Sequence, residues 1–125
     1  MNSHMIVYMD SSALIKRAET GPDSEVAADL WDSAERVVSS ELACSEARAA
    51  TEMPQETLEG LELVETDEQL AGAAEGLAAR HGLGTSESVH LAAALSIDAP
   101  RIVVATWNPA LGAAAAECGL AVVPR

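Results

Sequence analysis

The sequence predicts an α/β fold with a central, mostly parallel sheet flanked by helices. Short apolar runs typical of buried strands alternate along the chain with longer segments whose apolar residues recur at helical spacing. The composition agrees, because Phe is absent and aromatic residues make up only 2% of the 125 residues. Such Phe-poor, Ala-rich chains favour closely packed helices over aromatic-cored β sandwiches. Regular alternation of strand and helix predicts parallel strands joined by right-handed crossovers, with helices on both faces.

Each predicted strand is a short apolar run. The run at 5–9 is uninterrupted, and 102–105 has the β-branched residues of a buried parallel strand. The run at 61–64 is weaker because glutamates flank it. In chain order the predicted strands are 5–9, 36–39, 61–64, 102–105 and 120–123.

Each predicted helix combines an apolar stripe with a start or stop signal. Ser11 or Ser12 is expected to cap the first helix, which Gly21 and Pro22 then break. The last helix begins at Asn108-Pro109, with Asn as the cap and Pro in the first turn. In chain order the predicted helices are 11–19, 23–33, 40–51, 67–81, 86–97 and 108–117.

The chain is long enough for one domain, which we assign to 5–125, and too short for two. Residues 1–4 read like a cloning remnant before a native start at Met5. No segment approaches the roughly 20 apolar residues of a membrane span. Cys44 and Cys118 lack metal-ligand spacing and are expected to be free thiols. We therefore expect a cytoplasmic protein without membrane association.

The net charge of −13 argues against a nonspecific nucleic-acid binder, which should carry a basic face. The positive charges, however, are unevenly distributed. Lys16, Arg17 and Arg48 lie close in sequence to Asp10 or Glu46. These three basic residues could follow a nucleic-acid backbone, so a locally neutral or basic surface with an acidic back remains open.

Acidic and amide side chains are predicted to meet at one edge of the sheet. In open α/β sheets, ligands bind beyond the carboxyl ends of the strands. Asp10 ends the first strand, and Asn108 follows the strand at 102–105. Glu46 lies about two turns into its helix, and Glu87 lies in the first turn of its helix. Clustered carboxylates repel one another and need a cation, and hard oxygen ligands suit Mg²⁺ or Mn²⁺. A metal ion held in this way is typical of phosphodiester hydrolysis.

Each of these residues also has a purely structural interpretation. Asp10 could cap the helix that follows, and Glu46 could face solvent beside Arg48. Glu87 could be a favourable first-turn charge, and Asn108 could simply begin its helix. His90, one turn after Glu87, could lie in the core.

Four segments resemble, in order, the motif blocks of the PIN-domain ribonucleases, and of their VapC-type toxin branch in particular. The segments are IVYMDSSALIK (6–16), VSSELACSEARA (38–49), GTSESVHLAAAL (84–95) and VATWNPAL (104–111). The resemblance covers essentially 5–125. It implies a three-layer PIN-like fold and an endoribonuclease whose acidic quartet binds Mg²⁺ or Mn²⁺. It also implies a homodimer that a small antitoxin inhibits.

On this resemblance, Asp10, Glu46 and Glu87 match the first three acids and would bind the metal. Ser12 or Thr106 matches hydroxyls that support the site. Two positions depart from the family pattern. Glu87 replaces the usual Asp and is one methylene longer, and Asn108 stands where the fourth Asp is usual, which removes one negative charge.

Two other functions stay open. A degenerate PIN-like binding module would keep the fold and the partner contacts without catalysis, and Asn108 is the residue that suggests it. A receiver-like phospho-acceptor would need a Lys after the late strand, where Trp107 and Asn108 stand instead.

Overall fold

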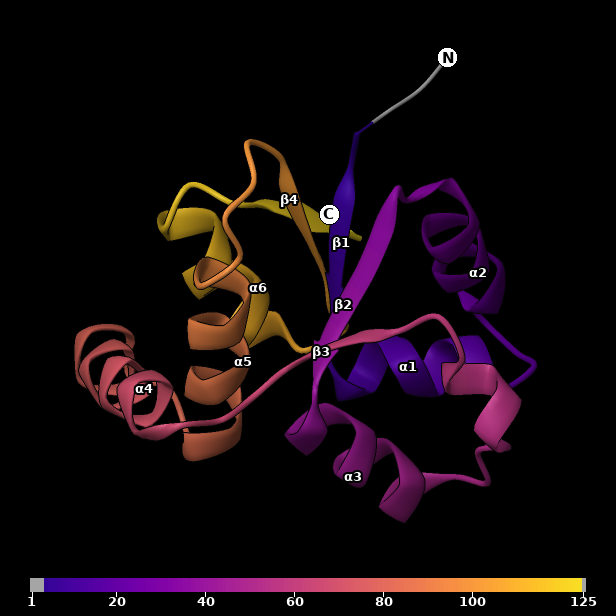
Figure 1. Ribbon diagram of the computed structural model, residues 1–125, viewed down its shortest axis with the longest axis horizontal. Coiled ribbons are helices and arrows are strands. Elements are labelled where there is room, and N and C mark those ends of the chain that lie inside the picture. Colours follow the sequence, from indigo (N-terminus) through magenta and orange to yellow (C-terminus); the bar gives the residue numbers. More distant parts are fainter. Residues whose placement is uncertain (1–3, 125) are drawn as a thin grey trace.

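A computed structural model, which describes residues 4–124, contains a parallel β-sheet as its middle layer (Figure 1). Within the described residues the sheet has five strands in the order β3-β2-β1-β4-β5. Residues 1–3 of the predicted cloning remnant and Arg125 lie outside the described residues. The strands are β1 (Ile6–Met9), β2 (Arg36–Ser40), β3 (Glu62–Val64), β4 (Ile102–Ala105) and β5 (Ala121–Val123).

Helices cover both faces of the sheet and give the fold three layers. In Figure 1, α1, α2 and α3 lie on one side of the strands, and α4, α5 and α6 lie on the other. This arrangement confirms the predicted α/β class with a parallel sheet. The helices are α1 (Ser11–Ala18), α2 (Ser24–Ser33), α3 (Glu41–Ala50), the short 3-10 helix η1 (Gln55–Leu58), α4 (Glu68–His81), α5 (Thr85–Leu95) and α6 (Pro109–Glu117).

Alternate residues of β1 supply two separate cores, because successive side chains of a strand point to opposite faces. Val7 and Met9 pack with α1 and α3, whereas Ile6 and Tyr8 pack with α4, α5 and α6. All four of these side chains are buried. Burial on both faces explains why β1 reads as a continuous apolar run instead of an alternating one.

The order of the strands creates a switch point between β1 and β4. From β1 the chain builds the sheet toward β2 and β3, and it then returns to add β4 on the other side of β1. At such a point the connections leave the two neighbouring strands in opposite directions and open a crevice beyond their carboxyl ends. Asp10 follows β1 and Thr106 follows β4, so both lie at this crevice.

Two local predictions differ from the structure, and one element was not predicted. Asp10 itself, not Ser11 or Ser12, caps α1 by accepting a hydrogen bond from the Ala13 N–H. The 3-10 helix η1 was not predicted, because four residues are too few to show a period. The apolar pattern of the predicted helix 86–97 makes Leu95 a candidate for burial, but Leu95 is 40% exposed at the end of α5. No helix in residues 4–124 has the length and apolarity needed to cross a membrane.

Candidate active site at the carboxyl edge of the sheet

Asp10 is the most completely fixed of the predicted acids. Its side chain is 2% exposed. Oδ1 accepts hydrogen bonds from Ser12 Oγ at 2.6 Å and from the Ala13 backbone N–H at 2.9 Å, and Oδ2 accepts one from Thr106 Oγ1. The structural role considered for Asp10 therefore applies. This role is compatible with the predicted site role, because a carboxylate held by several donors is fixed in orientation.

Ser12 and Thr106, predicted as supporting hydroxyls, both contact Asp10 and tie it to the loop after β4. Ser12 Oγ accepts a hydrogen bond from the Trp107 N–H at 2.8 Å. Thr106 Oγ1 accepts one from the Asn108 N–H at 3.0 Å. Each hydroxyl donates to the carboxylate and accepts from the loop backbone, so the ends of β1 and β4 are linked through side chains as well as through the sheet.

Glu46 lies in the second turn of α3 and is held from α5. One carboxylate oxygen accepts from Ser86 Oγ, and the other lies 2.9 Å from His90 Nε2. Burial raises the pKa of Glu46, but the hydrogen bonds from Ser86 and His90 outweigh it and hold the pKa below its ordinary value. The carboxylate, about a third exposed, is therefore ionised at neutral pH and contacts α5 instead of Arg48.

Glu87 and Asn108 contact each other across the ends of α5 and α6. Asn108 Nδ2 donates to Glu87 Oε2 over 3.3 Å, a long hydrogen bond. Asn108 Oδ1 accepts from the Ala110 and Leu111 N–H groups at 3.0 and 3.2 Å. The amide oxygen, the only atom of this side chain that could bind a cation, is thus used to cap α6.

Gly84 makes room for the Glu87 carboxylate. A Cβ at position 84 would lie 2.5 Å from Glu87 Oε1, closer than real Cβ contacts. Any larger residue at the N-cap of α5 would therefore displace this carboxylate. Gly84 is therefore a neighbour of the candidate site that sequence reasoning did not single out.

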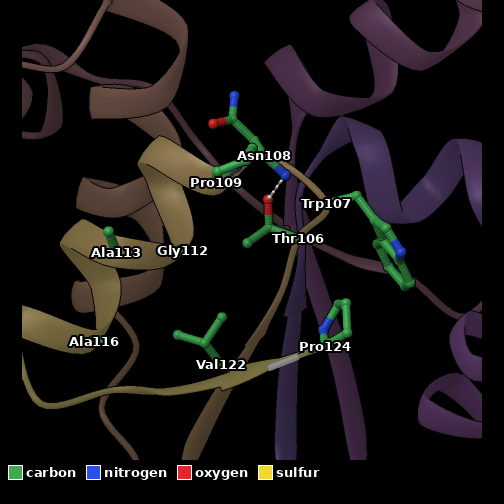
Figure 2. Close-up of a pocket in the computed structure, with 9 residues that line it drawn as sticks. All are labelled: Thr106, Trp107, Asn108, Pro109, Gly112, Ala113, Ala116, Val122 and Pro124. Atoms are coloured by element: carbon green, nitrogen blue, oxygen red, sulfur yellow. Dashed lines mark hydrogen bonds between the residues drawn. The ribbon is translucent and has the colours of Figure 1, made fainter.

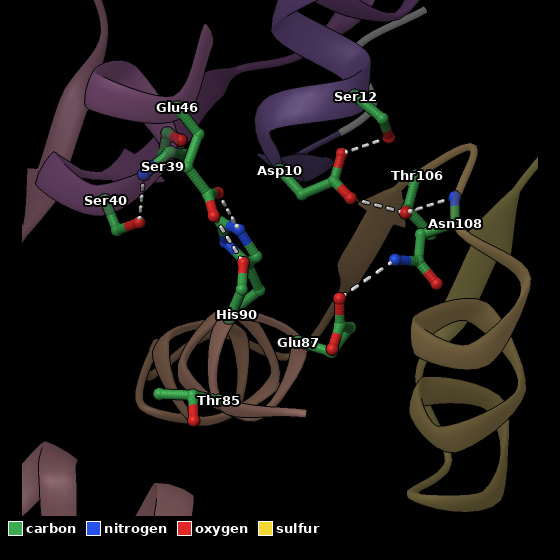
Figure 3. A network of polar contacts seen from close by, with 12 residues as sticks. Asp10, Ser12, Ser39, Ser40, Glu46, Thr85, Glu87, His90, Thr106 and Asn108 are labelled. Atoms are coloured by element: carbon green, nitrogen blue, oxygen red, sulfur yellow. Dashed lines mark hydrogen bonds and ion pairs between the residues drawn. The ribbon is translucent and has the colours of Figure 1, made fainter. Parts of the chain in front are cut away.

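The three predicted metal-binding carboxylates share the same edge of the sheet but have separate partners. Figure 3 shows Asp10 beside Thr106, Glu87 beside Asn108, and Glu46 beside His90. The donor chemistry fits Mg²⁺ or Mn²⁺, since carboxylate oxygens are hard ligands. In their present positions, however, no group of three or more His, Cys, Asp or Glu side chains in residues 4–124 is placed to hold a metal ion. The three-carboxylate metal site stays a prediction.

The basic residues predicted to follow RNA have different environments. The Arg17 guanidinium donates to the Thr57 carbonyl oxygen and lies 3.7 Å from the centre of the Trp31 ring. Burial lowers the pKa of Arg17, and these contacts attach α1 to α2 and η1. Lys16 is partly buried, and Arg48 is exposed on α3. Arg48 is therefore the most available of the three for an external partner.

A largely apolar pocket of about 620 Å³ is lined in part by Thr106 and Asn108, which also contact Asp10 and Glu87. Figure 2 shows it between α6 and the end of β5, with Val122 and Pro124 on one side and Gly112 on the other. Its described lining contains none of the three predicted acids. The pocket adjoins the candidate site without containing its charged groups.

From the sequence, His90 was expected either to lie in the core or to cover Glu87, and Tyr8, Ser40 and Ser86 were not identified as polar partners. His90 is indeed 3% exposed, but both of its ring nitrogens make polar contacts. One signal was present in the sequence. Ser86 and His90 are four residues apart and therefore lie on the same face of α5.

The five-stranded parallel sheet with helical layers on both faces is a PIN-like fold. Solved structures share this fold. The chain superposes on the crystal structure of FitAcB from Neisseria gonorrhoeae with a TM-score of 0.67 and 21% identity, covering 93% of this chain and 95% of that one. VapBC2 from Rickettsia felis, solved bound to a DNA fragment from their promoter, gives a TM-score of 0.64 at 15% identity, covering 94% and 97%.

The chain belongs to the VapC family of PIN-domain ribonucleases. It is 37% identical to Ribonuclease VapC45 of Mycobacterium tuberculosis strain CDC 1551 / Oshkosh over 139 aligned positions, which cover 93% of this chain and 94% of that protein. The same values hold for Ribonuclease VapC49 of Mycobacterium tuberculosis strain ATCC 25618 / H37Rv. No protein-family model matches the chain. The resemblance predicted from the four motif blocks is confirmed.

Proposed function

We propose that this protein is a metal-dependent endoribonuclease toxin that hydrolyses RNA phosphodiester bonds with Asp10, Glu46 and Glu87 as its metal ligands. Family membership supports the ribonuclease activity. The observation that carries the site is the buried, fully hydrogen-bonded carboxylate of Asp10 at the β1–β4 switch point, with Glu46 and Glu87 on the same edge. A bound Mg²⁺ or Mn²⁺ would activate water and neutralise charge on the phosphate.

The chain's own residues would orient the reaction. Ser12 and Thr106 fix both oxygens of Asp10, so this carboxylate needs no reorganisation when a cation arrives. Glu87 is held only by the long contact with Asn108 and is partly exposed. Glu87 is therefore the proposed ligand that can move toward an ion, and this movement would break one weak hydrogen bond.

A matched set of variants tests the proposal. Asp10→Asn, Glu46→Gln and Glu87→Gln each remove one charge at nearly constant shape. We expect each to abolish or strongly reduce cleavage of RNA in Mg²⁺ or Mn²⁺, and EDTA to stop the wild-type reaction. Glu117→Gln, at the far end of α6, is the control with the same change in net charge. Cleavage that persists in EDTA, or that survives Asp10→Asn, contradicts the proposal.

The Asn108–Glu87 hydrogen bond favours a second candidate, a PIN-fold binding module that has lost catalysis. Asn108 satisfies Glu87 without a cation, where an aspartate would leave two carboxylates facing each other. In this module the amide would replace the charge that a metal site needs. The dimer and antitoxin contacts would remain.

Asn108→Asp discriminates between the two candidates. Asp caps helices as well as Asn does, so α6 should stay intact. In a weakened nuclease we expect Mn²⁺ affinity to rise about tenfold or more, with a parallel gain in cleavage, because a unit charge beside a cation is worth more than the ~1.4 kcal/mol of a tenfold change. A folded Asn108→Asp variant without either gain, but with intact partner binding, supports the module.

The proposal extends to partners and compartment. The solved neighbours are the FitAcB and VapBC2 assemblies, and they motivate a small antitoxin partner for this chain. We expect a cytoplasmic homodimer that a co-expressed antitoxin inhibits. Light scattering on the purified chain tests the dimer, and loss of RNA cleavage on adding the antitoxin tests the inhibition. A monomer at micromolar concentration contradicts the dimer.

A further inference from the structure

A chain of polar contacts connects Glu46 to the interior of the sheet. His90 Nε2 lies 2.9 Å from Glu46 Oε1, and His90 Nδ1 lies 2.9 Å from the Tyr8 hydroxyl. That hydroxyl is in turn 3.1 Å from Ser40 Oγ, which caps α3 by accepting from the Ala43 N–H. The contacts join β1, β2, α3 and α5, and Figure 3 shows Glu46 and His90 facing each other between α3 and α5.

Because the residues of this hydrogen-bonded network are buried, their side chains are fixed in position. Tyr8 and Ser40 are completely buried, and His90 is 3% exposed. Burial raises the pKa of the Tyr8 hydroxyl well above its ordinary value, so the phenol stays neutral. No buried side-chain nitrogen or oxygen in the described residues lacks a hydrogen-bond partner. Moving the His90 ring would therefore leave a buried polar group unsatisfied, at a cost of about 1–3 kcal/mol.

The direction of the hydrogen bond to Glu46 follows from its chemistry. A carboxylate only accepts, so His90 Nε2 carries the proton and donates. This holds whichever way the Tyr8 proton points. Ser86 donates to the other oxygen of Glu46 from the same face of α5. Ser11 on α1 is a third hydrogen-bond partner of this carboxylate. Of the three donors, His90 is the one whose ring is also hydrogen-bonded to the buried Tyr8 hydroxyl.

We propose that His90, anchored by Tyr8 and Ser40, is a positioning residue that orients the Glu46 carboxylate for the metal ion of the proposed function. His90 does not itself bind the ion, because its two ring nitrogens are used toward Tyr8 and Glu46. Residues that hydrogen-bond metal-binding carboxylates set ligand orientation, and their loss typically costs 10–100-fold in metal affinity or activity. The inference rests on the proposed role of Glu46.

The test compares His90→Leu with His90→Gln. Leucine removes the donor and keeps an apolar core side chain, whereas glutamine retains an N–H that can reach Glu46. By calorimetry we expect the Mn²⁺ dissociation constant to rise about 10–100-fold in His90→Leu. We expect His90→Gln to restore most of the affinity. Tyr8→Phe, which removes only the anchoring hydroxyl, should give an intermediate loss and provides a second variant if His90→Leu does not fold.

His81→Leu is the matched control. His81 Nδ1 lies 3.0 Å from Glu117 Oε2, another His–Glu pair, at the end of α6 opposite Asn108. A similar loss of stability with unchanged Mn²⁺ affinity in His81→Leu shows that the effect at position 90 is specific. Equal losses of affinity in both variants overturn the proposal.

A structural readout separates this inference from the proposed function. In a metal-free crystal structure of His90→Leu, or of Tyr8→Phe, we expect the Glu46 carboxylate to leave its position beside Ser86. If Glu46 keeps its position, the positioning role is wrong, whatever the metal does. If Glu46 moves but wild-type protein binds no Mn²⁺, His90 positions Glu46 and the metal-dependent nuclease is what fails.

Discussion

Asp10 and Glu87 lie at the same edge of one sheet, but the fold holds them in different ways. Asp10 is 2% exposed and accepts three hydrogen bonds, whereas Glu87 is partly exposed and its carboxylate accepts one long hydrogen bond, from Asn108 at 3.3 Å. Asp10 comes from a buried strand end, and Glu87 comes from the first turn of a helix. From this difference we expect Asp10 to stabilise the fold as well as serve the candidate site, and we expect changes at Glu87 to affect stability much less.

The largest effect should come from Asp10→Ala. The substitution removes a helix cap worth about 1 kcal/mol and leaves the Ser12 and Thr106 hydroxyls without their acceptor. We expect the free energy of unfolding to fall by about 2–3 kcal/mol, measured by urea denaturation in EDTA. A change below about 0.5 kcal/mol would remove the structural half of the comparison.

Thr106→Val should have a smaller effect of the same kind. Valine keeps the volume but removes the donor to Asp10 and the acceptor for the Asn108 N–H. We expect a loss of about 1–2 kcal/mol in the same urea experiment. In the double variant with Asp10→Ala, the two losses should not add, because both break the same contact. Additive losses would show that the two residues act independently.

Removing the charge of Glu46 should have a pH-dependent effect on stability that is smaller than the effect of Thr106→Val. Its pKa is held below the ordinary value by Ser86 and His90. A carboxylate with a lowered folded pKa stabilises the protein above the ordinary Glu pKa of about 4.3, and this stabilisation is lost as the pH falls through the folded value. Glu46→Gln should therefore cost more stability at neutral pH than in acid. Thermal unfolding of the wild type and of Glu46→Gln, measured in EDTA from acid to neutral pH, gives the difference in stability. A difference that grows toward low pH has the wrong sign.

The smallest effect on stability should come from Glu87→Gln. Glutamine can keep the contact with Asn108 through its amide oxygen, so we expect the free energy of unfolding to stay within about 0.5 kcal/mol of wild type. Mn²⁺ affinity should fall nonetheless. Together with Asp10→Ala, this variant tests the comparison directly. A loss of stability like that of Asp10→Ala would mean that both acids are structural.

Gly84 offers a way to change the position of Glu87 while keeping its charge. Gly84→Ala should push the carboxylate away, because the new Cβ would lie 2.5 Å from Oε1. We expect weaker Mn²⁺ binding with little change in stability. Gly76→Ala on α4, where a Cβ meets nothing within 4 Å, is the control. Equal effects of the two substitutions on Mn²⁺ binding would show that the Glu87 carboxylate can move away from a Cβ at position 84 without weakening Mn²⁺ binding.

Most of the fold could be predicted from the sequence, because each strand and helix has a local cause. The uninterrupted apolar run of β1 and the Asn108-Pro109 start of α6 specify their elements without help from the rest of the chain. The cap of α1 was assigned to the wrong residue because Asp10, Ser11 and Ser12 are all good caps. The contact of Asp10 with Thr106, which depends on the tertiary structure, decides that Asp10 is the residue that caps α1.

The candidate site could be predicted in part. The sequence alone identified Asp10, Glu46, Glu87 and Asn108 as residues of one sheet edge, since strand ends in a parallel sheet share an edge. Glu46 pairs with His90, which is 44 positions away in the sequence, and Asn108 pairs with Glu87, which is 21 positions away. No local pattern encodes such contacts.

The sequence by itself determined the α/β class, the order of the elements, the family and the acids that could meet. Periodicity, capping and motif spacing are local properties, and each is written in a few neighbouring residues. Only the tertiary structure decided that Asp10 is locked while Glu87 is loosely held, and that His90 faces Glu46 instead of being an inert core residue. Those differences arise from packing between α3, α5 and the ends of β1 and β4, where burial fixes which donors each carboxylate can reach.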